Sequence, residues 1–149
     1  MTNSRYNSNM SIDQRVMMAL IRVAERYKKE AAAVFQKYEL TFPQYNVLRV
    51  LEASKDGRNT IKDVKQIMLT SSANMTGITQ RLEKFGFITR KNAPEDDRLR
   101  YLIITEKGRL LLKSISEKRG ELEQKYLRSY SIEKKEEILS LLRDLLNLK

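Results

Sequence analysis

Residues 69–108 have the sequence LTSSANMTGITQRLEKFGFITRKNAPEDDRLRYLIITEKG, and the fold can be inferred outward from this stretch. Ser71 or Ser72 can begin a helix, because a serine hydroxyl accepts a hydrogen bond from a free backbone N–H of the first turn. Gly86 can adopt the left-handed conformation that ends a helix. Between them, apolar residues at spacings of three and four predict one buried stripe, made of Met75, Ile78, Leu82 and Phe85.

Two β-rich segments follow this helix. Residues 87–91 and 99–104 are rich in β-branched and aromatic side chains and flank residues 92–98, so we expect an antiparallel hairpin with a long loop. A helix followed by a basic hairpin is the outline of a winged helix-turn-helix. In that module the hairpin, or wing, places Arg or Lys along DNA phosphates or in a narrow minor groove.

The predicted loop contains an acidic run, Glu95-Asp96-Asp97, which should repel DNA. A site for a hard metal ion is one interpretation, but it needs further oxygen ligands that the neighbouring sequence does not supply. In the other interpretation a carboxylate pairs with Arg98, which fixes the loop and aims the guanidinium. We expect the second arrangement, with Asp96 as the brace of the wing and no metal.

The face of the predicted helix opposite the apolar stripe carries small, neutral, hydrogen-bonding side chains in its first half. An ordinary surface helix usually carries Glu and Lys there, whereas short side chains suit a major groove, in which Gln or Asn can recognise adenine. Gly77 costs about 1 kcal/mol relative to Ala, and close approach to another surface would offset that cost. A solvated helix with a poor glycine is the alternative. The predicted DNA-contacting residues are Ser71, Ser72, Ala73, Asn74, Thr76, Gly77, Gln80, Arg81, Lys84, Lys91, Arg98 and Arg100.

Three helices are predicted before this stretch. Residues 11–37 form one long helix with apolar residues at three- and four-residue spacing. Residues 41–44, Thr-Phe-Pro-Gln, begin a second helix. After a turn at residues 55–59, in which Gly57 can take a positive φ, Thr60 caps a short third helix. A short helix followed by a polar break is the first half of a helix-turn-helix.

Two more helices are predicted after it. Thr105 caps a long helix that Gly120 interrupts, and Ser131 caps a final, leucine-rich helix. The final helix would expose a large apolar patch on a monomer. Alternatively, the final helix covers the protomer's own core as a lid. The alternative for the first helix is that it is a core helix of its own protomer. We expect instead a dimer interface formed by Ile12, Val16, Leu20, Leu139, Leu142, Leu145 and Leu146.

Length and composition limit the classes of function. The 149 residues fit a single domain, with an N-terminal dimerisation helix (1–40), a winged-helix lobe (41–104) and C-terminal dimerisation helices (105–149). The net charge of +10 attracts polyanions, but it is spread along the chain and does not itself establish nucleic-acid binding. The chain has no Cys and no His, which excludes disulfides, thiol switches and metal sites built on thiolate or imidazole.

Location and chemistry are also limited by what the sequence lacks. No apolar run is long enough to span a membrane, and the start, MTNSRYNSN, has no apolar signal core, so we expect a cytoplasmic protein without a membrane partner. There is no glycine loop for phosphate binding, no nucleophile elbow and no inward carboxylate pair. We therefore expect no enzyme activity and no cofactor.

Residues 41–108 resemble the MarR family (multiple antibiotic resistance regulators) of bacterial transcription regulators. The resemblance rests on four pieces in the family's order and spacing: LTFPQYNVL at 40–48, RLEKFGFITR at 81–90, Asp96-Asp97-Arg98 in the family's D-x-R position, and ITEKG at 104–108. It implies a homodimer with interlocking terminal helices, whose two winged helices contact a palindrome in successive major grooves. It also implies that Thr76 faces the groove and that Arg98 is the wing arginine, whereas Gly77 departs from the family's frequent Arg or Lys.

The expected fold is thus mainly α (α+β), a winged helix-turn-helix with long terminal dimerisation helices. The expected function is sequence-specific binding of double-stranded DNA by a dimeric regulator, with repression as the commoner family mode. A non-specific or architectural nucleic-acid-binding protein is the alternative, which the dispersed charge allows. The resemblance implies release by a small, often aromatic, effector. Core packing explains equally well the aromatic side chains that could line its crevice, Tyr27, Phe35, Tyr38 and Tyr45.

Overall fold

The computed structural model describes residues 9–148, and the chain divides into two compact units, residues 1–42 and 43–149. Residues 1–8, which hold most of the segment inspected for an apolar signal core, and residue 149 lie outside the described part. No helix among the described residues is long and apolar enough to cross a membrane.

The first unit is dominated by helix α1 (Ile12–Gln36), close to the range predicted from the sequence. A capping box begins it: the Ser11 hydroxyl accepts from the Gln14 backbone N–H at 3.2 Å, and the Gln14 side chain accepts from the Ser11 N–H at 3.0 Å. Near its C-terminal end, the rings of Tyr27 and Phe35 lie 6.3 and 5.9 Å from the ring of Phe42. These two aromatic side chains therefore take part in packing within their own unit.

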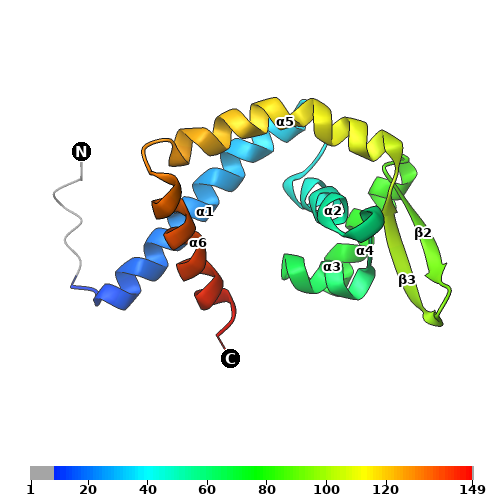
Figure 1. Cartoon of the computed structure of the whole chain (residues 1–149), viewed down its shortest axis with the longest axis horizontal. Helices are drawn as coiled ribbons and strands as arrows, with labels where there is room; N and C mark the ends of the chain where they lie inside the picture. The colour runs from blue at the N-terminus through cyan, green and yellow to red at the C-terminus, as the bar shows by residue number, and fades with distance from the viewer. Residues whose placement is uncertain (1–8, 149) are drawn as a thin grey trace. The chain divides into compact units, whose positions relative to one another are not determined.

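The second unit contains the winged helix-turn-helix that the sequence predicts (Figure 1). Its elements, from the helix that crosses the unit boundary onward, are α2 (Phe42–Ala53), a short 3-10 turn (Lys55–Gly57), β1 (Arg58–Thr60), α3 (Ile61–Met68), α4 (Ser72–Lys84), β2 (Ile88–Ala93), β3 (Asp96–Ile104), α5 (Glu106–Leu127) and α6 (Ile132–Leu146). The fold class expected from the sequence is confirmed.

Helix starts were predicted well because their signals are local. Thr60, Ser71, Thr105 and Ser131 each accept a hydrogen bond from the backbone N–H three residues further on, at 3.1–3.2 Å. Gly57 and Gly86 take the positive φ values expected of them, 66° and 77°. Gly120, by contrast, does not interrupt α5, and an added Cβ there would meet no atom within 4 Å among the described residues.

The described strands form a three-stranded antiparallel sheet in the order β1-β3-β2. Strand β1 was missed, since the sequence assigned Arg58 and Asn59 to a turn. Its register places Arg58 opposite Ile103 and Thr60 opposite Tyr101. A strand of three residues is too short to show periodicity, and it is stabilised by hydrogen bonds to a strand more than forty residues away.

The long loop predicted at residues 92–98 is wrong. Strand β2 continues to Ala93 and β3 begins at Asp96, so only Pro94 and Glu95 lie between the strands. The register shifts between Asn92 and Ala93, after which Ala93 pairs with Asp96. Asn and Asp have low strand propensity, but ladder hydrogen bonds outweigh that preference near the tip of the hairpin.

The buried stripe of α4 differs from the prediction at three positions, one of which is Ile78, which is only half-buried. Met75 and Leu82 are buried as expected, but Phe85 is 36% exposed and Thr79 is only 1% exposed. Thr79 lies between Met75 and Leu82 on the helix, and its hydroxyl donates to the Met75 carbonyl at 2.9 Å. Phe85 follows the last helical residue and lies against Phe87, with ring centroids 6.1 Å apart. The helix therefore buries a threonine hydroxyl where hydrophobicity predicts no core residue.

The predicted dimer residues are exposed or partly exposed in the described chain. In α6 no residue is buried, and Leu139, Leu142, Leu145 and Leu146 are 46, 37, 45 and 70% exposed. In α1, Ile12 and Val16 are 66 and 46% exposed, and Leu20 is half-buried. Each helix thus carries apolar area that its own unit does not cover.

Candidate nucleic-acid interface

Helices α3 and α4 form the helix-turn-helix. Leu69 ends α3 in the left-handed region, with φ 53° and ψ 42°, and its N–H donates to the Gln66 carbonyl at 3.3 Å. The N–H of Thr70 donates to the Lys65 carbonyl at 3.2 Å, so the turn satisfies carbonyls that the end of the helix would otherwise leave free. The chain then enters α4 at Ser71, the N-cap.

The predicted recognition face of α4 is exposed along its whole length. The DNA-contacting residues predicted on this face, on its flanks and at the start of the helix are all exposed: Ser71, Ser72, Ala73, Asn74, Thr76, Gly77, Gln80, Arg81 and Lys84. A Cβ added at Gly77 would meet no described atom within 4 Å, so this side of the helix is open to an approaching surface. The Thr76 hydroxyl donates to the Ser72 carbonyl at 3.0 Å. Its lone pairs remain available to accept a hydrogen bond, for example from a base amino group.

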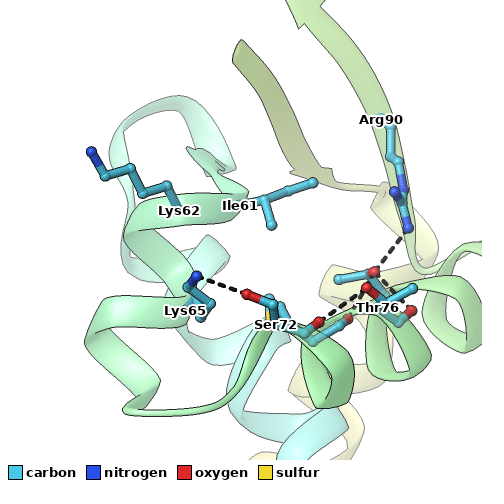
Figure 2. Close-up of a pocket in the computed structure, with 8 residues that line it drawn as sticks. Ile61, Lys62, Lys65, Ser72, Thr76 and Arg90 are labelled. Atoms are coloured by element: carbon cyan, nitrogen blue, oxygen red, sulfur yellow. Dashed lines mark hydrogen bonds between the residues drawn. The ribbon is translucent and has the colours of Figure 1, made fainter. Parts of the chain in front are cut away.

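A hollow of about 250 Å³ lies between α3, α4 and β2 (Figure 2). Lys65 extends to α4, where its ammonium donates to the Ser72 hydroxyl at 2.9 Å. Arg90 reaches in from the wing on the other side. The lining residues are Ile61, Lys62, Lys65, Ser72, Met75, Thr76, Thr79 and Arg90. Positive side chains thus join the helix pair to the wing, which favours a polyanionic partner.

Asp96 and Arg98 make the contact predicted for the acidic run. The Asp96 carboxylate accepts from the Arg98 backbone N–H at 2.9 Å and from its guanidinium Nε at 3.2 Å. These hydrogen bonds, the backbone one first, lower the pKa of Asp96 below its ordinary value of 3.8. The Arg98 side chain is 91% exposed, so the pair fixes a guanidinium that remains accessible to another molecule.

Glu95, at the turn of the wing, has a different partner. It accepts from the Tyr101 hydroxyl at 2.6 Å, which lowers the pKa of Glu95 and raises the pKa of Tyr101. The Arg58 guanidinium lies 5.0 Å from the centre of the Tyr101 ring, a cation–π contact between β1 and β3. In the described part of the chain, no group of three or more metal-binding side chains is present.

The other two predicted wing residues lie on opposite faces of the hairpin. Lys91 is paired with Tyr101 and Asn92 with Arg100, so Lys91 and Arg100 occupy neighbouring ladder positions whose side chains alternate. Both are exposed. A flat DNA surface could contact only one of them, whereas the two walls of a groove could contact both.

Sequence reasoning missed Arg90, which connects the wing to the recognition helix. Its Nη2 donates to the Thr79 hydroxyl at 2.8 Å, and its Nε donates to Glu83 at 2.7 Å. Along the chain, Arg90 lies 7 positions from Glu83 and 11 positions from Thr79. No local pattern predicts this contact, although a polar residue between two apolar stripe positions is a signal that could have drawn attention to Thr79.

Comparisons with known proteins agree with this geometry. The family model described as "Transcriptional regulator SarA/Rot" matches residues 26–115. The organic hydroperoxide resistance transcriptional regulator of Bacillus subtilis (strain 168) is 28% identical over 103 residues, which cover 69% of this chain and 69% of that protein.

Solved structures share the fold at low sequence identity. Sco3205, a MarR family transcriptional regulator from Streptomyces coelicolor in complex with DNA, has a TM-score of 0.81 at 18% identity and covers 97% of this chain and 91% of its own. NadR in complex with 4-hydroxyphenylacetate has a TM-score of 0.82 at 23% identity, covering 96% and 98%. The MarR resemblance inferred from the sequence is confirmed in the fold. Because the family model matches more than half of its residues, the chain belongs to the SarA/Rot family of transcriptional regulators.

Proposed function

We propose that this protein regulates transcription by sequence-specific binding to double-stranded DNA, with α4 in the major groove and the wing against the neighbouring backbone or minor groove. It acts by binding and not by catalysis, in the cytoplasm of a bacterium. The observation that carries the proposal is the exposed face of α4, which is small and uncharged in its first half. A face that attracted only phosphates would carry Lys and Arg throughout.

The wing supplies the charge that this face lacks. Arg98 is held by Asp96 and is 91% exposed, so its guanidinium is pre-oriented and accessible. Phosphate contacts fix the register of a protein on DNA, whereas contacts to base edges select the sequence. The proposal therefore assigns phosphate contact to Arg98 in the wing and base recognition to side chains such as Gln80 in α4.

The proposed DNA site is a palindrome bound by a homodimer. Supporting this, the leucines of α6, and Ile12 and Val16 near the start of α1, are exposed within their own units. Covering such area removes apolar surface from water, which is worth roughly 25 cal/mol per Å². A two-fold dimer would present two copies of α4 to successive major grooves.

A small effector that releases the DNA is the proposed mode of regulation, with repression as the default state. The support for an effector comes from NadR, a protein of the same fold whose structure holds 4-hydroxyphenylacetate. Of the four aromatic side chains considered for an effector crevice, Tyr45 is 5% exposed and its hydroxyl accepts from Arg119 at 2.9 Å. A titration of the DNA complex with 4-hydroxyphenylacetate is a direct first test, since dissociation would support an aromatic effector.

Selection of bound sequences from random duplex DNA tests the proposed function. We expect an enriched palindrome whose half-sites are centred about 10–10.5 base pairs apart. Enrichment of no sequence, together with strongly salt-dependent binding to every duplex, would instead establish the non-specific or architectural alternative. The dispersed net charge of +10 is the observation that favours this second candidate.

A further inference from the structure

We propose that Arg90 is a positioning residue, which fixes the recognition helix against the base of the wing and so sets the spacing between the two DNA-contacting elements. This inference rests on the proposed function, because spacing matters only if α4 and the wing bind one DNA site together. It assigns Arg90 a role in selecting the sequence, although the residue need not touch a base.

The contact spans one turn of α4. Arg90 lies on β2, and its guanidinium donates from Nε to Glu83 at 2.7 Å and from Nη2 to Thr79 at 2.8 Å. Figure 2 shows Arg90 extending from its strand toward α4. Thr79 and Glu83 are four residues apart and so lie on one side of the helix. Two hydrogen bonds from one planar group restrain the rotation of α4 more than a single contact would.

Thr79 is suited to this contact by its burial. It is 1% exposed, and its single hydroxyl proton is directed to helix carbonyls, 2.9 Å to Met75 and 3.2 Å to Thr76. The oxygen lone pairs are therefore free to accept from Arg90. A buried acceptor has few alternative partners, so losing this donor costs more free energy than losing a donor at the surface.

Arg90 also lies where the wing begins. Its register partner on β3 is Leu102, which is fully buried, so Arg90 shares the sheet face that packs against the helices. The register shifts two residues later, between Asn92 and Ala93, and the hairpin then continues to Arg98. A register shift changes the local bend and twist of a strand. The Arg90 contact lies just before this shift, so it sets the direction from which the strand bends. It thereby sets the direction of the segment that carries Arg98.

A direct phosphate contact is the competing role for Arg90, whose side chain is 24% exposed and lines the hollow beside Lys65. The two roles predict different measurements. Losing a phosphate contact weakens binding to all DNA sequences and lowers the slope of affinity against salt by about one. Losing a positioning contact weakens binding to the selected site but leaves non-specific affinity and the salt slope unchanged.

The experiment compares full-length Arg90→Lys and Thr79→Val with the wild type. Binding to the selected site and to a scrambled duplex is measured by fluorescence anisotropy over a range of salt. Arg90→Lys keeps the charge but loses the paired hydrogen bonds. Thr79→Val keeps the shape but loses the acceptor, at a position too buried to contact DNA. We expect both to lower the ratio of specific to non-specific affinity by about tenfold, the size of one lost base contact.

Matched variants separate positioning from stability. Thr79→Ser keeps the hydroxyl and should retain the wild-type ratio of specific to non-specific affinity. Thr89→Val makes the same Thr-to-Val change as Thr79→Val, but at an exposed position on β2, and should leave that ratio unaltered. Melting temperatures are measured for all variants, because a lower folded fraction weakens binding to both duplexes equally. The double variant Arg90→Lys/Thr79→Val should be no worse than Arg90→Lys alone, since Arg90→Lys already removes the hydrogen bond to Thr79.

Three outcomes would contradict the inference. A wild-type ratio in both Arg90→Lys and Thr79→Val shows that the contact does not set specificity. Equal weakening on both duplexes, with a lower salt slope in Arg90→Gln, which removes the charge, but not in Thr79→Val, identifies Arg90 as a phosphate contact. A wild-type protein that binds both duplexes equally contradicts the proposed function, and the inference with it, before any variant is compared.

Discussion

Asp96 accepts two kinds of hydrogen bond from Arg98, one from its backbone N–H at 2.9 Å and one from its guanidinium Nε at 3.2 Å. The first fixes the chain and the second fixes the side chain. An acidic residue in the wing can therefore orient a neighbouring cation, which is the role that the proposed function gives to Asp96. This relationship leads to predictions for each residue of the pair.

Replacing Arg98 with Ala should weaken binding at every DNA sequence and leave the oligomeric state unchanged. The expected signature is a salt slope reduced by about one per wing, because one phosphate contact is lost from each. Anisotropy on specific and scrambled duplexes, with sedimentation for the oligomeric state, checks both parts. Lys113→Ala, which removes one exposed positive charge from α5, is the control. Unchanged affinity in Arg98→Ala would make the wing assignment wrong.

Replacing Asp96 with Asn should weaken DNA binding, although the change removes a negative charge from a DNA-binding surface. Electrostatics alone predicts tighter binding, so the sign of the effect decides between a brace and a repelling charge. Asp97→Asn removes the same charge from the next residue, which is exposed, and should bind DNA as tightly as the wild type or more tightly. If both variants bind more tightly, Asp96 is no brace.

Replacing Gln80 with Ala should change which bases are preferred and not only how tightly DNA is bound. A good side-chain contact to a base edge contributes about 1–3 kcal/mol of discrimination. Selection from random DNA with the variant should therefore give an altered consensus at one position of each half-site. Lys84→Ala, on the same face, should weaken all sequences alike. An unaltered consensus in Gln80→Ala would remove this residue from base recognition.

Deleting residues 131–149 should give monomers or aggregates, because it removes α6 and its exposed leucines. Light scattering after gel filtration measures the outcome. Double substitution of Leu142 and Leu145 by Glu tests the same surface in a full-length chain, in which the helix itself can still form. A stable dimer in both cases would show that α6 is not the interface.

Replacing Tyr101 with Phe should raise the pKa of Glu95 toward its ordinary value of 4.5, since the Tyr101 hydrogen bond is the main cause that lowers it. A lowered pKa in the folded state contributes stability that is present above the ordinary value and is lost as the pH falls through the folded value. The Glu95–Tyr101 contact should therefore persist at neutral pH and weaken only in acid. Carboxyl resonances followed by NMR titration measure the shift, and an unshifted Glu95 in the variant would contradict the contact.

The sequence predicted those parts of the fold whose signals are local. Ser71 and Thr105 cap helices through hydrogen bonds to residues three positions on, and Gly86 ends α4 with a positive φ. The exposed face of α4 was predicted for the same reason, because its residues follow from helical periodicity. The pairing of Asp96 with Arg98 involves residues two apart and was also accessible from the sequence.

The parts that were missed depend on contacts between distant residues. Strand β1 exists because Arg58 pairs with Ile103, and the wing is longer than expected because its ladder continues past Asn92. Thr79 is buried because Arg90 satisfies its oxygen from another element. Propensity and periodicity describe single segments. They therefore cannot identify the hydrogen-bond partner, on another element, that allows a polar residue to be buried in a core.

Gly77 has a consequence for how the regulon of such a protein can diverge. Apart from its chain neighbours and the nearby backbone of α4 itself, no described atom lies within 4 Å of the Cβ that another residue would add, and the helix would gain about 1 kcal/mol from Ala there. Substitutions at this position thus meet no obstacle from the fold, and their effects fall on the surface that α4 presents. On the proposed function, in which this surface contacts DNA, a single codon could retune the set of promoters the protein occupies while its architecture is inherited unchanged.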